Sequence, residues 1–183
     1  MTVPTFITGN HEKAARVNAW LGMDLPHQKV DLEEIQAPVR DIVAYKAKKA
    51  YEAIGTAVLV EDVSLECAAL GGMPGPYIKW FLDNTGTEAI CRMLDGFADR
   101  SATARCVWAY YDGTELSYIE GVQEGQIAQS PRGDGGFGWD VLFIPNGQQL
   151  TRSEMSPDVY QQHYTESKNF AGVRAFLLAR TNQ

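Results

Sequence analysis

Apolar residues recur along the first half of the chain in short runs typical of strands and in longer stretches with helical spacing. The runs that predict strands are residues 3–8, 29–32 and 57–60. Val43 and Ala47 belong to a set of apolar residues at helical spacing, which predicts a helix over 39–54. Asn10 begins a second helical stretch that reaches residue 21, and asparagine is a favoured N-cap. Alternating strands and helices favour an α/β fold.

The second half of the chain adds antiparallel strands to this pattern. Asp112 and Gly113 separate two β-type stretches, 102–111 and 115–127, and this arrangement predicts a long hairpin. The remaining predicted elements are helices at 87–94 and 167–180 and a strand at 139–144. We expect one domain over residues 1–183, with an elongated mixed β-sheet flanked by helices and two lobes around a central cleft.

Composition narrows the class of protein without identifying a function. Apolar residues make up 45% and charged residues 21% of the chain, as in ordinary globular proteins. The net charge of −7 disfavours nucleic acid and anionic membranes as partners. No apolar run approaches the roughly 18 residues of a membrane span, and the first apolar run, residues 3–7, has no basic region before it, so we expect a protein that is neither membrane-spanning nor secreted. The 3 cysteines are odd in number and show no Cys-x-x-Cys spacing, which indicates neither a disulfide framework nor a zinc site, so we expect a reducing, cytoplasmic setting.

The turn after the first predicted strand is suited to phosphate binding. Thr8, Gly9 and Asn10 lie where a glycine lets the backbone approach a ligand and where the amides of a helix N-terminus attract anions. Lys13 would add a full positive charge. The same residues would also suit an ordinary capped helix with a solvated lysine.

Acidic residues in two neighbouring segments are suited to a magnesium site. Glu61 and Asp62 follow the run 57–60, which places them at the carboxyl end of a predicted strand, where open α/β sheets bind ligands. Together with Glu34 they offer the oxygen ligands that Mg²⁺ takes alongside phosphates and water. The alternative for Glu34 is a solvated acidic turn. Lys46 lies at the margin of the apolar stripe of helix 39–54 and could reach the edge of the sheet, or could simply be solvated.

Residues 133–138 match the pattern G-x-G-x-x-G, but their position excludes a dinucleotide-binding turn. Such a turn follows the first strand of a βαβ unit and opens a helix, whereas this segment is late and leads into a predicted strand. Phe137 and Trp139 could instead contact a flat ring, and Asp140 could accept hydrogen bonds from its N–H groups. An aromatic pair that closes the core beneath a glycine turn is the alternative.

Taken together, these motifs resemble the inosine triphosphate pyrophosphatase family, enzymes for noncanonical purine nucleotides. The segments that carry the resemblance, spread over nearly the whole chain, are residues 6–13, 31–36, 60–62, 71–81 and 135–140. The resemblance implies that ITP, dITP and XTP are hydrolysed to the monophosphate and pyrophosphate, which cleanses the nucleotide pool. It also implies a homodimer. The alternatives are a pyrophosphatase of the related Maf type and a nucleotide-binding regulatory protein with weakened catalysis.

The resemblance also implies a role for each candidate residue. Asp62 would be the general base, and Glu34 and Glu61 would bind Mg²⁺. The substrate-binding residues would be Thr8, Gly9, Asn10, Lys13, Lys46 and Lys79 on the triphosphate, Phe137, Gly138, Trp139 and Asp140 on the base, and Lys168 and Arg174 nearby.

The C-terminal segment departs from the family pattern. The family usually has Ser-His-Arg shortly after a Lys-Asn pair, but here Gly172 and Val173 precede Arg174. The segment before Lys168 is also longer than usual. We therefore expect weaker rejection of adenosine and guanosine triphosphates, or a replacement contact from His163 or Tyr164 in the lengthened segment.

Overall fold

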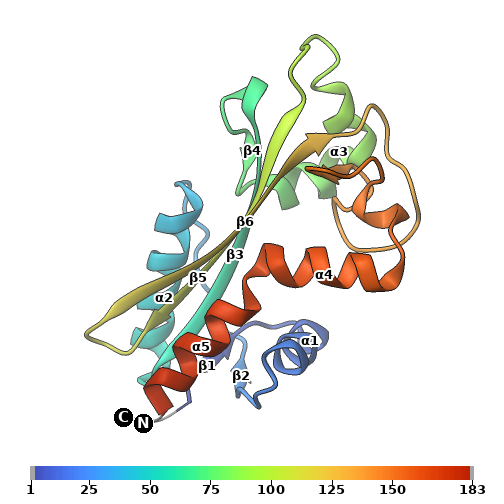
Figure 1. The fold of residues 1–183 in the computed structure, drawn as a ribbon. Helices are drawn as coiled ribbons and strands as arrows, with labels where there is room; N and C mark the ends of the chain where they lie inside the picture. The colour runs from blue at the N-terminus through green and yellow to red at the C-terminus, as the bar shows by residue number, and fades with distance from the viewer. Residues whose placement is uncertain (1–2, 182–183) are drawn as a thin grey trace. The chain divides into compact units, whose positions relative to one another are not determined.

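The structure, a computed structural model, describes residues 3–181 and shows a mixed α/β fold (Figure 1). Its seven-stranded sheet has the order β2-β1-β3-β5-β6-β7, and β4 pairs with β3. The strands are β1 (Thr5–Ile7), β2 (His27–Gln28), β3 (Val58–Cys67), β4 (Pro74–Gly75), β5 (Ser101–Tyr111), β6 (Leu116–Ile127) and β7 (Phe143–Pro145). The helices are α1 (His11–Leu21), α2 (Val39–Ile54), α3 (Ile78–Arg92), α4 (Pro157–Lys168) and α5 (Phe170–Thr181), with short 3-10 helices η1 (Ala68–Leu70) and η2 (Arg152–Glu154). The predicted α/β class with a mixed sheet and flanking helices is confirmed.

Strand directions explain why the sheet is mixed. β1 runs parallel to β2 and β3, with Phe6 opposite His27 and Leu59. β7 runs antiparallel to β6, with Gln126 opposite Ile144. The predicted hairpin of β5 and β6 is present, and Asp112 closes its turn by accepting backbone hydrogen bonds from Thr114 and Glu115. No helix within residues 3–181 combines the length and apolar character needed to cross a membrane.

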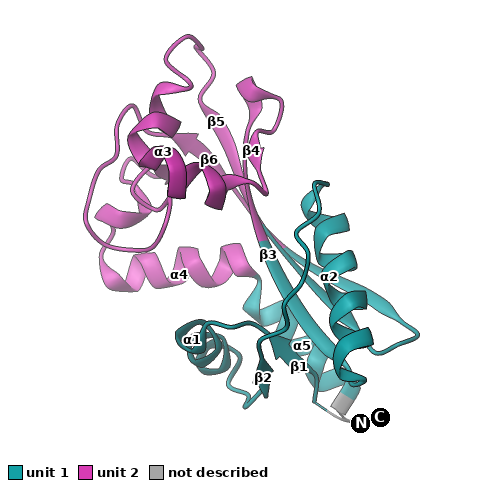
Figure 2. Cartoon of the chain, turned by 180° about the vertical axis from the view of Figure 1, so that it is seen from behind, with its two compact units in different colours: residues 1–62, 106–120, 169–183 teal, residues 63–105, 121–168 magenta. Residues whose placement is uncertain are grey.

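The chain divides into two compact units (Figure 2). Unit 1 comprises residues 1–62, 106–120 and 169–183, and unit 2 comprises residues 63–105 and 121–168. The boundaries fall within β3, β5 and β6, so each of these strands contributes residues to both units. Each unit has its own hydrophobic core, and the single-domain assignment stays a prediction.

The core of unit 1 follows from the two-residue periodicity of its strands. Val107 and Ala109 of β5 belong to an apolar cluster with the buried face of α2. Trp108, between them, contacts Phe170 of α5 and Phe6 of β1, with ring centroids 5.7 and 5.9 Å apart. Because successive side chains of a strand point to opposite faces, β5 supplies an aliphatic layer on one side and an aromatic layer on the other.

The core of unit 2 gathers apolar residues from β3, α3, β5 and the segment that leads into β7. Its fully buried members include Leu65, Ile78, Ile90, Leu142 and Phe143, and Trp139 packs against the same cluster. The buried Cys91 of α3 also belongs to this core, and burial raises the pKa of its thiol to about 11. Cys67, Cys91 and Cys106 are all buried, and none of the three forms a disulfide.

One prediction that matters for the site was wrong. The strand expected at 57–60 continues to Cys67, so Glu61 and Asp62 lie inside β3 rather than at its carboxyl end. The two acids suggested an end because charged residues rarely occupy a strand interior. They are tolerated here because Lys13 of α1 and Lys46 of α2 pair with them, and the partners lie far away in the sequence.

Several other boundaries also differ from the prediction. No strand forms at 29–32, where β2 instead comprises His27–Gln28, and the strand expected at 139–144 begins only at Phe143. Helix α3 starts at Ile78 and continues through a non-helical Gly86 (φ 75°, ψ 175°), well before the expected residue 87. The helix expected at 167–180 is interrupted at Asn169, whose φ of 50° ends helical geometry. The polar helix α4 precedes it and was not predicted.

Candidate active site

The turn between β1 and α1 has the predicted cap. Asn10 accepts a hydrogen bond from the backbone N–H of Lys13 at 2.9 Å, and the hydroxyl oxygen of Thr8 accepts one from the backbone N–H of Asn10 at 3.1 Å. These bonds order the turn and place Gly9 between two fixed residues. The exposed amides at the start of α1 are the kind of group that attracts phosphate oxygens.

Lys13 forms an ion pair with Glu61, one of the two acids inside β3. The side chain of Glu61 is only 2% exposed, whereas that of Lys13 is 37% exposed. Cys106 of β5 contacts the other carboxylate oxygen of Glu61, with Sγ 3.3 Å from Oε1. A lysine therefore neutralises the buried carboxylate from the solvent side, and a thiol contacts it from the neighbouring strand.

Lys46 joins the remaining predicted acids. Its Nζ lies 2.8 Å from Oδ2 of Asp62 and 3.4 Å from Oε1 of Glu34. Burial acts to lower the pKa of Lys46, but the carboxylates of Asp62 and Glu34 outweigh it and raise this pKa. Lys46 is therefore firmly cationic. The residues just before Lys46 and Glu34 make a similar contact, since the Tyr45 hydroxyl donates to Glu33 at 3.1 Å.

The donor set of unit 1 fits Mg²⁺ as a site completed by substrate. No group of three or more histidine, cysteine or acidic side chains among residues 3–181 is arranged to hold a metal ion alone. Glu34, Glu61 and Asp62 supply hard oxygen donors, and Mg²⁺ commonly binds one or two carboxylates together with phosphates and water. Lys13 and Lys46 place positive charge against these carboxylates, so the oxygens already face cations.

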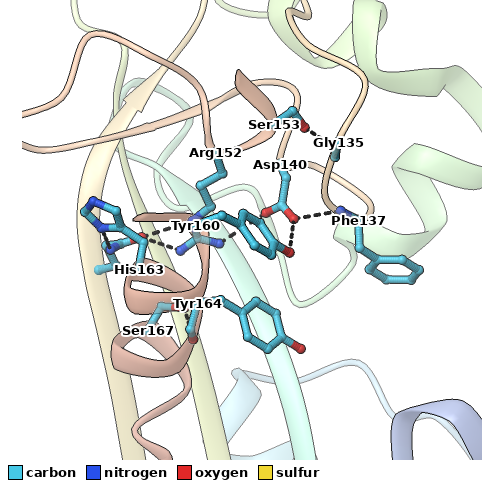
Figure 3. A network of polar contacts seen from close by, with 10 residues as sticks. Gly135, Phe137, Asp140, Arg152, Ser153, Tyr160, His163, Tyr164 and Ser167 are labelled. Carbon is cyan, nitrogen blue, oxygen red and sulfur yellow. Dashed lines mark hydrogen bonds and ion pairs between the residues drawn. The ribbon is translucent and has the colours of Figure 1, made fainter. Parts of the chain in front are cut away.

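Asp140 of unit 2 is buried at the centre of a polar network (Figure 3). Its Oδ2 accepts hydrogen bonds from the backbone N–H of Phe137 at 2.7 Å and from the hydroxyl of Tyr160 at 2.9 Å. Its Oδ1 lies 3.4 Å from Nη1 of Arg152. Gly136 has a φ of 76°, and a Cβ there would lie 2.7 Å from Oδ2 of Asp140, so the turn requires glycine at this position. Asp140 thus fixes the glycine-rich loop.

Arg152 links Asp140 to a second layer of the network. Its Nε donates to Oε1 of Gln123 at 3.0 Å, and its guanidinium lies 4.7 Å from the centre of the Phe143 ring. The side-chain amide of Gln123 pairs in turn with His163 Nδ1 at 2.8 Å. Sequence reasoning missed Arg152, Gln123 and Tyr160, because nothing local marks an arginine or a glutamine as buried.

The predicted base-binding residues 137–139 of unit 2 differ in their exposure to solvent. The Phe137 side chain is 77% exposed and available to stack, whereas Trp139 packs against the core, where its buried Nε1 has no hydrogen-bond partner among the described residues. Gly138 adopts a left-handed φ of 64° between them. Trp139 thus packs on the core beneath the glycine turn, and its contact with a base stays a prediction.

Three predicted cations lie at other places within their own units. Lys79 contacts Asp83 one turn further along α3, at 2.5 Å, and both side chains are exposed. Lys168 lies at the end of α4 with its Nζ 5.9 Å from the centre of the Tyr164 ring. Arg174 donates from Nε to the carbonyl of Leu21 at 3.0 Å, at the carboxyl end of α1. No contact of Arg174 in this structure brings it to the carboxylates of β3.

Known proteins are similar over nearly the whole chain. A sequence model described as the Ham1 family matches residues 4–176. The inosine triphosphate pyrophosphatase of Yarrowia lipolytica is 40% identical over 97% of this chain and 97% of that protein. The inosine triphosphate pyrophosphatase of Emericella nidulans is 44% identical over 86% of this chain and 87% of that protein. Among solved structures, a HAM1 protein from Coxiella burnetii has a TM-score of 0.82 at 26% identity and covers 100% of both chains.

Proposed function

Because the chain belongs to the Ham1 family, we propose that it is a pyrophosphatase that hydrolyses ITP, dITP and XTP to the nucleoside monophosphate and pyrophosphate. The similarity to relatives named inosine triphosphate pyrophosphatase over most of both chains carries this proposal. The lysine and carboxylate groups of unit 1 support it, since they supply the cations and the acids that cleavage of a phosphoanhydride needs.

Lys13 and Lys46 bind the triphosphate in this proposal, together with Thr8, Gly9, Asn10 and Lys79. The ammonium group of each lysine, at the end of a flexible side chain, forms an ion pair with a carboxylate. A polyanionic substrate would compete with that carboxylate for the ammonium group. Substrate binding then frees oxygens of Glu61 and Glu34 for Mg²⁺. The bound ion would neutralise phosphate oxygens and so stabilise the departing pyrophosphate.

Asp62 acts as the general base. Its carboxylate takes a proton from water as the water oxygen forms a bond to the α-phosphorus. The bond between the α-phosphorus and the oxygen bridging to the β-phosphorus breaks, and pyrophosphate leaves. Lys46, 2.8 Å from Oδ2 of Asp62, holds this carboxylate in position until substrate binds. Phe137, Gly138, Trp139 and Asp140 bind the base, with Lys168 and Arg174 as further contacts.

The setting of the reaction is part of the same proposal. The resemblance supports a homodimer that works in the cytoplasm with Mg²⁺. Sedimentation of the purified protein at micromolar concentration tests the dimer, and a mass of 20.2 kDa would contradict it.

Pyrophosphate release from a panel of triphosphates tests the proposed activity. The panel holds inosine, xanthosine, deoxyinosine, guanosine, adenosine and pyrimidine triphosphates with Mg²⁺. We expect the highest kcat/KM on ITP, dITP and XTP. A preference for pyrimidine or other modified nucleotides would favour the Maf-type alternative, and binding without release would favour a regulatory protein.

A further inference from the structure

Helix α4 carries a stripe of three side chains on one face. Tyr160, Tyr164 and Lys168 follow one another at four-residue spacing, which places them one above the other along a helix. The rings of Tyr160 and Tyr164 are stacked, with centroids 5.8 Å apart and planes 24° apart. Figure 3 shows both rings on the side of α4 toward Asp140 and Phe137, while the His163 ring points away from them.

The protein itself already occupies most of the acceptor capacity of Asp140. The carboxylate has about four acceptor positions. Oδ2 receives the backbone N–H of Phe137 and the hydroxyl of Tyr160, and Oδ1 faces Arg152. The Asp140 side chain is 5% exposed. A ligand therefore meets a carboxylate that is nearly saturated, with Tyr160 half-buried beside it.

The Tyr160 hydroxyl is fixed in one hydrogen-bonding role. Burial, and then the neighbouring carboxylate of Asp140, raise the pKa of Tyr160 above its ordinary value, so the phenol keeps its proton at neutral pH. That single proton is donated to Asp140. The phenolic oxygen can then only accept a hydrogen bond from any further partner.

We propose that Tyr160 is a specificity residue, whose phenolic oxygen accepts a hydrogen bond from the N1–H of the purine base. This inference rests on the proposed function and names the substrate class more closely. Purines with a carbonyl at the six-position carry a proton on N1, whereas adenine has an unprotonated N1 that would face the acceptor. Tyr164 extends the aromatic surface toward Lys168. The site therefore rejects ATP but discriminates weakly against GTP, whose N1 also carries a proton.

Replacement of one hydroxyl tests the assignment. Tyr160→Phe should lower kcat/KM for ITP about tenfold and leave kcat/KM for ATP nearly unchanged, since one hydrogen bond to the base is lost. Tyr118→Phe is the control, because it removes a tyrosine hydroxyl from β6 of unit 1 that the proposal does not use, and it should leave the ratio of kcat/KM for ITP to kcat/KM for ATP unchanged. If Tyr160 had a merely structural role, the substitution would lower kcat/KM for ITP and for ATP equally.

A substrate analogue tests the same contact without any change to the protein. The triphosphate of N1-methylinosine lacks the N1–H, so the wild type should use it about tenfold less well than ITP, and Tyr160→Phe should show no such difference. Equal use of the two nucleotides by the wild type would overturn the assignment even if the variant does not fold. The assignment would also be overturned if a folded Tyr160→Phe variant kept the wild-type ratio of kcat/KM for ITP to kcat/KM for ATP. A wild type that releases no pyrophosphate from any purine triphosphate would instead refute the proposed function.

Discussion

Each of the two units contains a cluster of paired charges, and the clusters differ in how deeply their cations are buried. In unit 1, Lys13 pairs with Glu61 and Lys46 with Asp62, and Lys13 is 37% exposed. In unit 2, Arg152 and Asp140 are each 5% exposed. A lysine offers a compact charge on a flexible stem, whereas the planar fork of an arginine is held by several fixed acceptors.

Because of this difference, the lysines of unit 1 can exchange their carboxylates for substrate phosphates, whereas Arg152 of unit 2 cannot leave Asp140. Because Lys13 is partly exposed, a phosphate can reach its ammonium group, and a metal ion can then replace the lysine beside the buried carboxylate of Glu61. A buried pair leaves an uncompensated charge when one partner is removed. We therefore expect substitutions in unit 1 to impair chemistry and substitutions around Arg152 to impair folding.

Loss of the proposed base should give the largest effect. Asp62→Asn removes basicity with little change in shape, and kcat on ITP should fall by roughly 10²- to 10⁴-fold. The free energy of unfolding and the affinity for ITP should change little. Asp41→Asn, at an exposed residue in the first turn of α2, is the control and should keep normal turnover. Near-normal turnover of Asp62→Asn would remove Asp62 from the role of base.

Loss of Arg152 should give the largest effect on stability. Arg152→Met leaves Asp140 buried without its cation, and removing one partner of a buried pair costs about 3–5 kcal/mol of unfolding free energy. Chemical denaturation measures this change. Arg132→Met is the matched control, because the pair of Arg132 with Glu154 in the same unit is much more exposed and should contribute about 1 kcal/mol or less. Equal losses in both variants would contradict the proposed difference between the clusters.

A smaller effect is expected at Cys106, the neighbour of Glu61. Its thiol lies 3.3 Å from Oε1 of Glu61, so we expect it to orient a metal-binding carboxylate. Outer contacts of this kind are typically worth 10- to 100-fold in metal affinity. Cys106→Ala should therefore weaken Mn²⁺ binding about tenfold in a titration with a non-hydrolysable ITP analogue bound, and Cys106→Ser should restore much of it. Cys91→Ala, buried in the core of unit 2, should leave Mn²⁺ binding unchanged.

The smallest effect concerns pH and His163. Burial lowers the pKa of His163, Arg152 lowers it further and Glu166 opposes them. Because the folded pKa lies below the unfolded value of about 6.5, the unfolded chain takes up the proton first as pH falls. The contribution of His163 to stability is therefore present above pH 6.5 and is lost as pH falls toward the folded pKa.

Unfolding curves of the wild type and His163→Asn between pH 7.5 and pH 5.5 measure this contribution. The difference in unfolding free energy between the two proteins should shrink at the acid end by less than about 1 kcal/mol. A difference that grows as pH falls would show that the folded protein favours the protonated imidazole.

The predictable parts of the fold are those that local sequence determines. Helix α2 has the expected bounds because its apolar residues keep helical spacing to Ile54 and Gly55 then adopts a left-handed φ of 70°. Asn10 caps α1 as predicted, because its side chain accepts a hydrogen bond from Lys13, only three residues away. Helix α4 was missed because it is polar and has few buried residues, so no apolar stripe marks it.

The candidate site was predictable where a short motif supplies several residues together. The turn at residues 8–13 and the acids of β3 are examples, although the charged pair at Glu61 and Asp62 suggested the wrong end for β3. The contacts of Arg152 with Asp140 and Gln123 join residues 12 and 29 positions apart. Partners at such separations become neighbours only through the sheet and its loops, so the sequence alone did not reveal them.

The position of water attack tests the central claim most directly. Hydrolysis of ITP in water enriched in ¹⁸O, followed by mass spectrometry of both products, shows which phosphorus the water oxygen joins. Attack at the α-phosphorus, with Asp62 as base, predicts ¹⁸O in inosine monophosphate and none in pyrophosphate. Label in pyrophosphate, or release of labelled orthophosphate, would contradict the account.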